Sequence, residues 1–315
     1  MKNIVVLYFL LFSFGLCAQQ SLTHSIEHGF RQVDVFNPEW ETQQTLNPCK
    51  YEHMTGYFRE ELARIILTAV SEKKVKIYDI RRREISLDSV IRKIIDFEKN
   101  NFGISLGRDS VFSYIIPYVS SYQFEEFIDY DYNDLSLSKK VKAYCPYLVR
   151  YRSFDQTRAD SVQLPLFWIF PSERGDSSEV LHIPDTVLSV QKLVYPNQMP
   201  FSSSLFYQVQ NGKIKVFRSN GLEFDTNREI EQLFILSSNV SYYDEQTEEE
   251  KTKTVFSDIV PEDIVALRLG ELWSIDKHSL EIKKEVCFFL PLYFHDDDMY
   301  SQLGLRIYNK AYRNQ

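Results

Sequence analysis

The sequence has 315 residues, of which 44% are hydrophobic, 15% aromatic and 25% charged, and its formal net charge is −8. This many apolar side chains can bury a large core, which excludes the disordered and low-complexity classes. Only ten residues are glycine, about 3% against a usual share of about 7%, which argues against glycine-rich nucleotide-binding loops. The acidic balance also argues against a nucleic-acid partner.

The chain begins like an exported protein. Lys2 precedes an apolar run from Ile4 to Leu16, and Leu16-Cys17-Ala18 resembles a cleavage site for a signal peptidase. The run is shorter than the roughly 20 residues of a membrane-spanning helix. We therefore expect a signal peptide over residues 1–18 and a mature chain with no transmembrane segment. The expected location is the periplasm, with the extracellular space as the alternative.

Three cysteines remain after this cleavage, namely Cys49, Cys145 and Cys287. An oxidising compartment permits disulfides, but an odd number leaves at least one thiol free. The sequence leaves open whether Cys145 and Cys287 pair with each other.

Helices and strands are first predicted after a polar N-terminal arm at residues 19–56. Apolar residues recur every three or four positions from Phe58 to Glu72 and again from Leu87 to Phe97, which predicts two helices. Between them, residues 74–79 alternate polar and apolar side chains, as is typical of a half-buried strand.

A similar series of residues returns 139 positions later. Lys213-Ile214-Lys215-Val216-Phe217 repeats the pattern of Lys74-Val75-Lys76-Ile77-Tyr78, and residues 228–236 supply a second helix. A later block around Cys145 resembles one around Cys287 at an offset of 142. The alternative is that two unrelated α+β segments share a helix followed by an amphipathic strand.

From this repeat we predict an α+β fold of two similar lobes produced by a diverged duplication. Each lobe would pack helices on a small, mostly antiparallel sheet. The first lobe would span residues 57–184 and the second residues 201–315. Residues 185–200 include Pro196 and Pro200 and read as a linker.

One segment resembles a hydrolase motif. Gly103-Ile104-Ser105-Leu106-Gly107 fits G-x-S-x-G, in which a turn between a buried strand and a helix exposes a nucleophilic serine. Here a polar helix end precedes the motif, and Gly103 suits a helix C-cap. We therefore do not expect an enzyme, and an exported hydrolase that uses Ser105 is the alternative.

Three further segments carry metal-ligand residue types. Asp129, Asp131 and Asn133 begin like a calcium loop, but the sixth position has no glycine and Lys140 replaces the bidentate glutamate. His295 and Asp296 are weak candidates for a hard metal, and residues 24–28 match H-x-x-E-H. The H-x-x-E-H segment lies just after the cleavage site, where a third ligand is hard to supply, and the adjacent carboxylates after His295 repel one another. We therefore expect no metal and no cofactor.

Four tripeptides fit an Asp-Ser/Thr-apolar pattern that resembles the O-glycosylation sites of exported Bacteroidota proteins. The resemblance implies that the hydroxyl side chains are glycosylation candidates where they are exposed. They are Ser89, Ser110, Ser161 and Thr186.

Two blocks in the second lobe resemble a known family. Asp258-Ile259-Val260-Pro261-Glu262-Asp263-Ile264 is followed by Leu272-Trp273-Ser274-Ile275-Asp276-Lys277. They are similar to the Pro-Glu-Asp-Ile and Trp-x-x-Asp-Lys stretches of the gliding-motility and type IX secretion N-component family (GldN/PorN) of Bacteroidota. Leu166-Phe167-Trp168-Ile169-Phe170 also resembles an apolar strand of that family.

The resemblance implies a non-enzymatic periplasmic subunit of an oligomeric assembly. Its implied partners are an outer-membrane lipoprotein and motor-complex proteins. The interface candidates are Trp168, Trp273, Asp276 and Lys277, although burial in the core is the alternative for both tryptophans. An exported carbohydrate- or host-binding protein remains the other alternative, because tyrosines and tryptophans are numerous.

Overall fold

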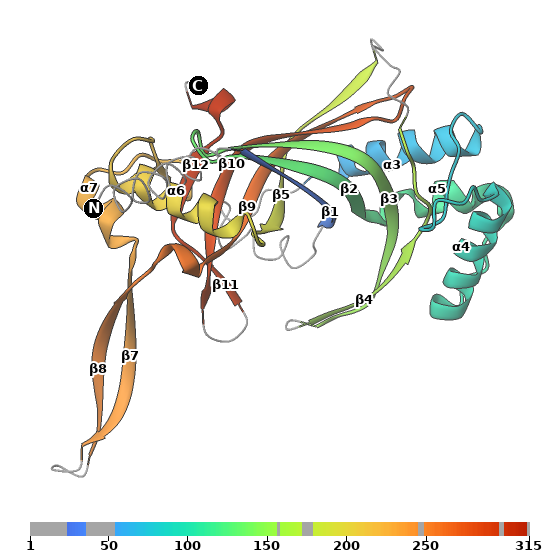
Figure 1. Ribbon diagram of the computed structural model, residues 1–315. Helices are drawn as coiled ribbons and strands as arrows, with labels where there is room; N and C mark the ends of the chain where they lie inside the picture. The colour runs from blue at the N-terminus through green and yellow to red at the C-terminus, as the bar shows by residue number, and fades with distance from the viewer. Residues whose placement is uncertain are drawn as a thin grey trace, which may run out of the picture.

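Two large antiparallel sheets, a separate two-stranded ribbon and two groups of helices make up the described part of the fold, which is α+β as predicted. The computed structural model describes residues 24–35, 54–155, 158–171, 179–244, 249–295 and 299–313. The predicted signal peptide, most of the N-terminal arm and Cys49 lie outside the described residues. The helices α3 and α4 lie at one end of the molecule, and α6 and α7 lie at the other, with the sheets between them (Figure 1).

The first half, residues 24–171, contains a four-stranded sheet in the order β1-β2-β3-β4. Its elements are β1 (His24–Asp34), α3 (Gly56–Ser71), α4 (Leu87–Phe102), η1 (Arg108–Ser110), α5 (Val111–Ile115), η2 (Ile116–Tyr118), β2 (Val119–Asp131), β3 (Ser136–Asp155) and β4 (Arg158–Pro165). After β4, Trp168 and Ile169 form single bridges with Tyr78 and Tyr144.

The second half, residues 179–313, contains a sheet in the order β5-β9-β10-β12-β6, with β11 paired to β10. Its elements are β5 (Val180–Lys192), α6 (Gln198–Gln210), β6 (Phe217–Arg218), α7 (Asn227–Gln232), β7 (Ile235–Asp244), β8 (Glu249–Asp258), η3 (Pro261–Asp263), β9 (Ile264–Asp276), β10 (Ile282–His295), β11 (Met299–Gln302), β12 (Leu305–Tyr308) and η4 (Lys310–Tyr312).

The two halves follow the same order of elements. Each has a long strand, a helix, a short paired segment, a second helix, a hairpin of two long strands and a short closing segment. Tyr78 bridges Glu84, and Phe217 bridges Glu223 at the equivalent place. The turn after the first helix has a positive φ in both halves, at Lys73 and at Gly212.

Each half completes the hydrophobic core of the other. The tip of the β2–β3 hairpin, with Tyr132 and Leu135, is buried against α6 and sheet residues of the second half. The tip of the β9–β10 hairpin, with Ile275 and Leu280, is buried in the core that contains α3 and α4. The two hairpins therefore cross, and neither core is built from one half alone.

Helix α4 shows why the sequence signals for a helix were reliable here. The Ser86 side chain accepts a hydrogen bond from the Ser89 amide at the N-terminus, and Gly103 ends the helix with φ 68°, as predicted for a C-cap. Arg150 of β3 reaches Glu98 at 3.0 Å and fixes the helix on the sheet.

Several predicted boundaries were wrong. Residues 180–192 form the edge strand β5, which includes the first part of the predicted linker, and residues 24–34 of the predicted arm form β1. The predicted strand at residues 74–79 is only a bridge at Tyr78, and α7 ends at Gln232 so that β7 begins at Ile235. In each case sheet pairing, which connects distant segments, decided the local structure.

A two-stranded ribbon, β7–β8, projects from the second half, away from both sheets (Figure 1). It is inserted between α7 and η3, and the first half has no such insertion among its described residues. Its exposed apolar side chains include Val240, Tyr243 and Phe256, the last with 68% of its surface accessible. An isolated two-stranded ribbon is marginally stable in water, so these side chains suit contact with another surface.

Candidate interaction site

A buried cluster of four charged side chains joins the two halves, and we call it the quartet. It consists of Glu126 and Lys139 from the first half and Glu271 and Lys284 from the second. Both second-half residues lie 145 positions after their first-half counterparts. The strand registers agree, because Lys139 faces Ile128 across the hairpin and Lys284 faces Trp273.

The contacts of the quartet cross between the halves. Lys139 Nζ lies 2.5 Å from Glu271 Oε1 and 3.3 Å from Glu126 Oε1. Lys284 Nζ lies 3.1 Å from Glu126 Oε2. The Ser189 hydroxyl donates to Glu271 at 2.8 Å, and the Trp273 indole donates to the same carboxylate at 3.0 Å.

Burial and pairing act in opposite directions on these groups. Burial alone would raise the pKa of Glu126, but the ammonium groups of Lys139 and Lys284 lower it. Burial would lower the pKa of Lys139, yet Glu126 and Glu271 raise it. For Lys284 burial dominates and lowers the pKa, and the nearby ammonium group of Lys139 adds to this effect. The Lys284 ammonium also lies over the rings of Phe124 and Trp273.

The quartet is charge-balanced and closed to solvent, with every side chain at most 2% exposed. Removing one partner of a buried pair is strongly destabilising, because the remaining charge has no water to replace it. The arrangement therefore fixes how the halves fit together, and it offers no room for a substrate.

Two equivalent turns end the crossing hairpins. Asp131 Oδ1 accepts hydrogen bonds from the amides of Asn133 and Asp134. Asp276 Oδ1 accepts from the amides of His278 and Ser279 in the same way. These carboxylates hold the turn backbone, so the candidate calcium ligand Asp131 and the candidate interface residue Asp276 have the same structural role.

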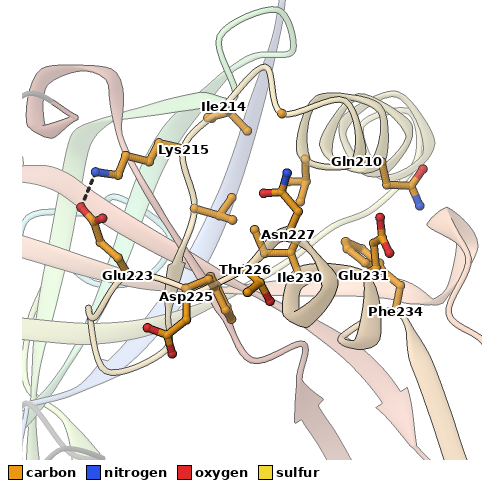
Figure 2. Close-up of a pocket in the computed structure, with 14 residues that line it drawn as sticks. Gln210, Ile214, Lys215, Glu223, Asp225, Thr226, Asn227, Ile230, Glu231 and Phe234 are labelled. Carbon is orange, nitrogen blue, oxygen red and sulfur yellow. Dashed lines mark hydrogen bonds and ion pairs between the residues drawn. The ribbon is translucent and has the colours of Figure 1, made fainter.

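A groove between α6 and α7 lies on the surface of the second half (Figure 2). Its cavity volume is about 580 Å³. Apolar side chains form its floor, and these are Val209, Ile214, Val216, Phe224, Ile230 and Phe234. Polar side chains stand around it, including Gln210, Lys215, Glu223, Asp225, Asn227 and Glu231 (Figure 2).

The first half has an equivalent groove of about 460 Å³ beside Val70, Val75 and Ile77. Its ion pair between Lys76 and Glu84, at 2.9 Å, matches that between Lys215 and Glu223. The charges beyond that pair differ. Glu231 stands on the second groove, whereas Arg92 occupies the position 139 residues earlier in the first half.

The groove of the second half continues toward the foot of the ribbon. A neighbouring cavity of about 610 Å³ shares Gln210, Glu231 and Phe234 with it and reaches Asp258. Ile235 and Val260 line this part and are 45% and 43% exposed. The two cavities form one surface, which we call the α6–ribbon groove.

The predicted interface residues lie in different places. Trp273 is 1% exposed and packs between the halves, and Trp168 is 5% exposed beneath Phe30, whose ring is 5.8 Å away. Lys277 is exposed, next to the buried Asp276. Both tryptophans therefore contribute to packing within this chain.

Ser105 does not sit on a nucleophile elbow. It is exposed in the irregular segment that follows the Gly103 cap, and no strand precedes it. The geometry that activates a serine in G-x-S-x-G is thus missing at this position.

The metal candidates are not brought together. Within the described residues, no group of three or more His, Cys, Asp or Glu side chains could hold a metal ion. His28 of the H-x-x-E-H segment lies on strand β1 instead of a helix, and its ring is 3.1 Å from Glu125. Asp296 and the side chain of His295 lie outside the described residues. In the part of the chain that the structure describes, Asp129 belongs to no such cluster, and neither does its neighbour Asn133.

The glycosylation candidates differ in exposure. Ser89 and Ser110 are exposed, whereas Ser161 and Thr186 are half-buried. Cys145 and Cys287 are both buried free thiols rather than a disulfide. Burial raises the pKa of the Cys145 thiol to about 12, so it is unreactive near neutral pH.

Sequence reasoning missed the quartet. Lys139 and Lys284 each have charged neighbours in the sequence, so neither stands out alone, and the offset of 145 between them and between the two glutamates was the available signal. The α6–ribbon groove left no sequence signal, because it depends on where the ribbon leaves the fold.

These features define a class of protein: a two-half α+β scaffold whose outward features are a groove and a projecting ribbon. Residues 190–307 match the protein family described as "Gliding motility associated protein GldN". Over this segment the chain is therefore similar to the GldN family, which confirms the family resemblance noted in the sequence. A comparison with curated proteins finds no match.

The matched segment begins near the end of β5 and ends within β12. It therefore contains the ribbon, the α6–ribbon groove and the second-half residues of the quartet. Among the described residues, no helix combines the length and apolar composition needed to cross a membrane.

Proposed function

We propose that this protein is a periplasmic structural subunit of a gliding-motility and type IX secretion complex. It binds an outer-membrane lipoprotein and motor-complex proteins as part of an oligomeric assembly, and it carries out no catalysis. The observation that carries this proposal is the GldN match over residues 190–307, which includes the projecting ribbon. An exposed apolar ribbon on a rigid scaffold suits protein contact.

We also propose that the two halves arose by duplication. The shared element order, the positive φ at Lys73 and Gly212, the twin grooves and the quartet residues at a constant offset support this origin. In this view the second half kept the family's partner-binding features, while the first half became its permanent packing partner.

The test is genetic complementation in the source bacterium. Deleting the gene should abolish gliding and type IX secretion, and the full-length chain should restore both. A variant in which residues 237–256 are replaced by a two-residue turn should fold, because the ribbon is outside both cores, yet fail to restore them. Mass spectrometry of the periplasmic fraction should find a mature N-terminus at Gln19.

A matched control removes a different exposed segment. Replacing Ile80 and Arg81 of the exposed turn before α4 by Gly-Asn alters the surface without touching the ribbon, and this variant should complement fully. If the gene deletion leaves both gliding and secretion intact, or if the protein fractionates with the cytoplasm, the proposal is wrong.

A further inference from the structure

The α6–ribbon groove differs from its counterpart in the first half in a way that indicates a partner. Both grooves have an apolar floor and one lysine–glutamate ion pair. The second shares three lining residues with a cavity at the foot of the ribbon, whereas the first shares only Ile85 with its neighbouring cavity. The extended surface has two apolar compartments of about 580 and 610 Å³.

The charges around this surface are not balanced. Glu223 is paired with Lys215, while Asp225 and Glu229 are both paired with Arg218. Glu231 and Asp258 are exposed, and in the described part of the chain neither has an ion-pair partner. These two carboxylates flank the shared wall at Phe234, so negative charge is concentrated where the compartments meet.

We infer that the α6–ribbon groove binds an amphipathic segment of a partner protein, one that carries apolar side chains and at least two lysines or arginines. This inference rests on the proposed function, since it names the chemistry of a partner in that assembly. The apolar side chains would enter the two compartments, and the basic groups would meet Glu231 and Asp258. Complementary charge at an exposed rim contributes mainly to specificity and association rate.

The first half explains why this surface is selective. The first groove is lined by two cations, Lys73 and Lys76, and by two carboxylates, Glu84 and Asp88, so its charges are balanced. A basic segment would gain no net attraction there and would be attracted to the second groove. One scaffold thus presents two similar apolar grooves of different charge, and only one suits a basic partner.

The test uses purified full-length protein and two fluorescein-labelled helical peptides of equal length. The first peptide has leucines on one face of the helix and lysines on the opposite face. The second has the same sequence with glutamate in place of every lysine. Fluorescence anisotropy should show binding of the lysine peptide and at least tenfold weaker binding of the glutamate peptide. The double variant Glu231→Lys, Asp258→Lys should weaken binding of the lysine peptide about tenfold or more.

The matched control is Asp96→Lys, Asp109→Lys, which changes the net charge equally on exposed residues of the first half. Its affinity for the lysine peptide should stay within twofold of the wild type. Circular dichroism melts of both double variants should coincide with the wild type, since all four side chains are exposed.

A second arm identifies the natural segment. A photo-crosslinking amino acid at Gln210 in the native cell should crosslink a protein segment that contains apolar residues and lysine or arginine. Equal loss of peptide binding in both double variants would overturn the inference, because the attraction would then be non-specific. Crosslinking to an acidic segment or to lipid would also overturn it. If the Glu231→Lys, Asp258→Lys variant restored gliding and secretion, the inference about the partner of the groove would be wrong. The proposed function as a subunit would still stand.

Discussion

The two halves of this protein share one architecture but use it differently. In the first half, α4 has sixteen residues and is fixed to the sheet by Glu98 and Arg150. In the second half, the equivalent helix α7 has six residues, and the chain leaves the fold at once to form the ribbon. The shorter helix is followed directly by a segment that projects from the body. The difference teaches that a projecting segment can be accommodated at the end of a helix without altering the core.

Several features that the two halves share lie at the junction, which is the region where the two halves pack against each other. The quartet, the paired aspartate turns and the exchanged hairpin tips are found on both sides of the junction. A buried charged cluster adds little net stability compared with apolar packing, but it penalises any arrangement that separates its partners. The common features therefore define the assembly of the halves, and the different features define what each half presents to the outside.

The largest expected effect comes from breaking the quartet on either side. Lys139→Met and Lys284→Met should each lower the free energy of unfolding by about 3–5 kcal/mol, because each leaves buried carboxylate charge unpaired. Chemical denaturation of the full chain measures this loss. Lys215→Met, which breaks an exposed ion pair, is the control and should leave the midpoint nearly unchanged. A large loss for one lysine and none for the other would show that the halves do not share the junction equally.

Acid should weaken the junction through Glu126. Its pKa is lowered in the folded state from an ordinary value of 4.5 to about 2 by Lys139 and Lys284, despite burial. A lowered folded pKa gives stability that is complete above pH 4.5 and is lost as the pH falls toward about 2. The unfolding midpoint of the wild type should fall over this range more steeply than that of Glu126→Gln. Glu84→Gln, at an exposed pair, should keep the wild-type slope.

The aspartate turns should respond alike in the two halves, with a smaller effect. Asp131→Ala and Asp276→Ala each remove two hydrogen bonds to turn amides, which should cost about 1–2 kcal/mol. The Asp276 variant should lose more, because its side chain is more deeply buried. Asparagine retains the acceptor oxygen and should recover most of the loss at both positions. A loss of stability at only one of the two turns would show that the aspartate turns do not contribute alike in the two halves.

Much of the fold could be predicted from local patterns. Helices α3 and α4 follow a three-to-four periodicity, and α4 also has a serine cap and a terminal glycine; these signals act within one helix. The repeat at an offset of 139 was visible because Lys213 to Phe217 keeps the residue pattern of the equivalent turn. Local chemistry decides such segments, so the sequence was enough.

The junction could not be predicted, because it depends on contacts between distant strands. Strand β1 looked like a polar arm, since its exposed and buried positions only make sense beside β2. Strand β5 was mistaken for a linker because its pairing partner β9 comes about eighty residues later. Burial of any one of the four quartet charges would be unfavourable by itself. It becomes favourable only when the two hairpins cross and bring the four side chains together. The charge pattern of the α6–ribbon groove could not be predicted either, because it depends on how the fold places Glu231 and Asp258 along one cavity.

The smallest expected effect concerns the turn after the first helix of each half. Gly212 has φ 61° and Lys73 has φ 58° at the equivalent position, and this left-handed conformation is unfavourable for residues with a Cβ atom. A Cβ added at Gly212 would meet no atom within 4 Å, so Gly212→Ala should cost only the backbone penalty of about 1 kcal/mol. Lys73→Gly should relieve the same penalty and stabilise by about 0.5–1 kcal/mol, less the greater entropy of glycine in the unfolded chain. Thermal melts should therefore shift in opposite directions for the two variants. Shifts in the same direction would show that the two turns, although equal in backbone geometry, are supported differently by their halves.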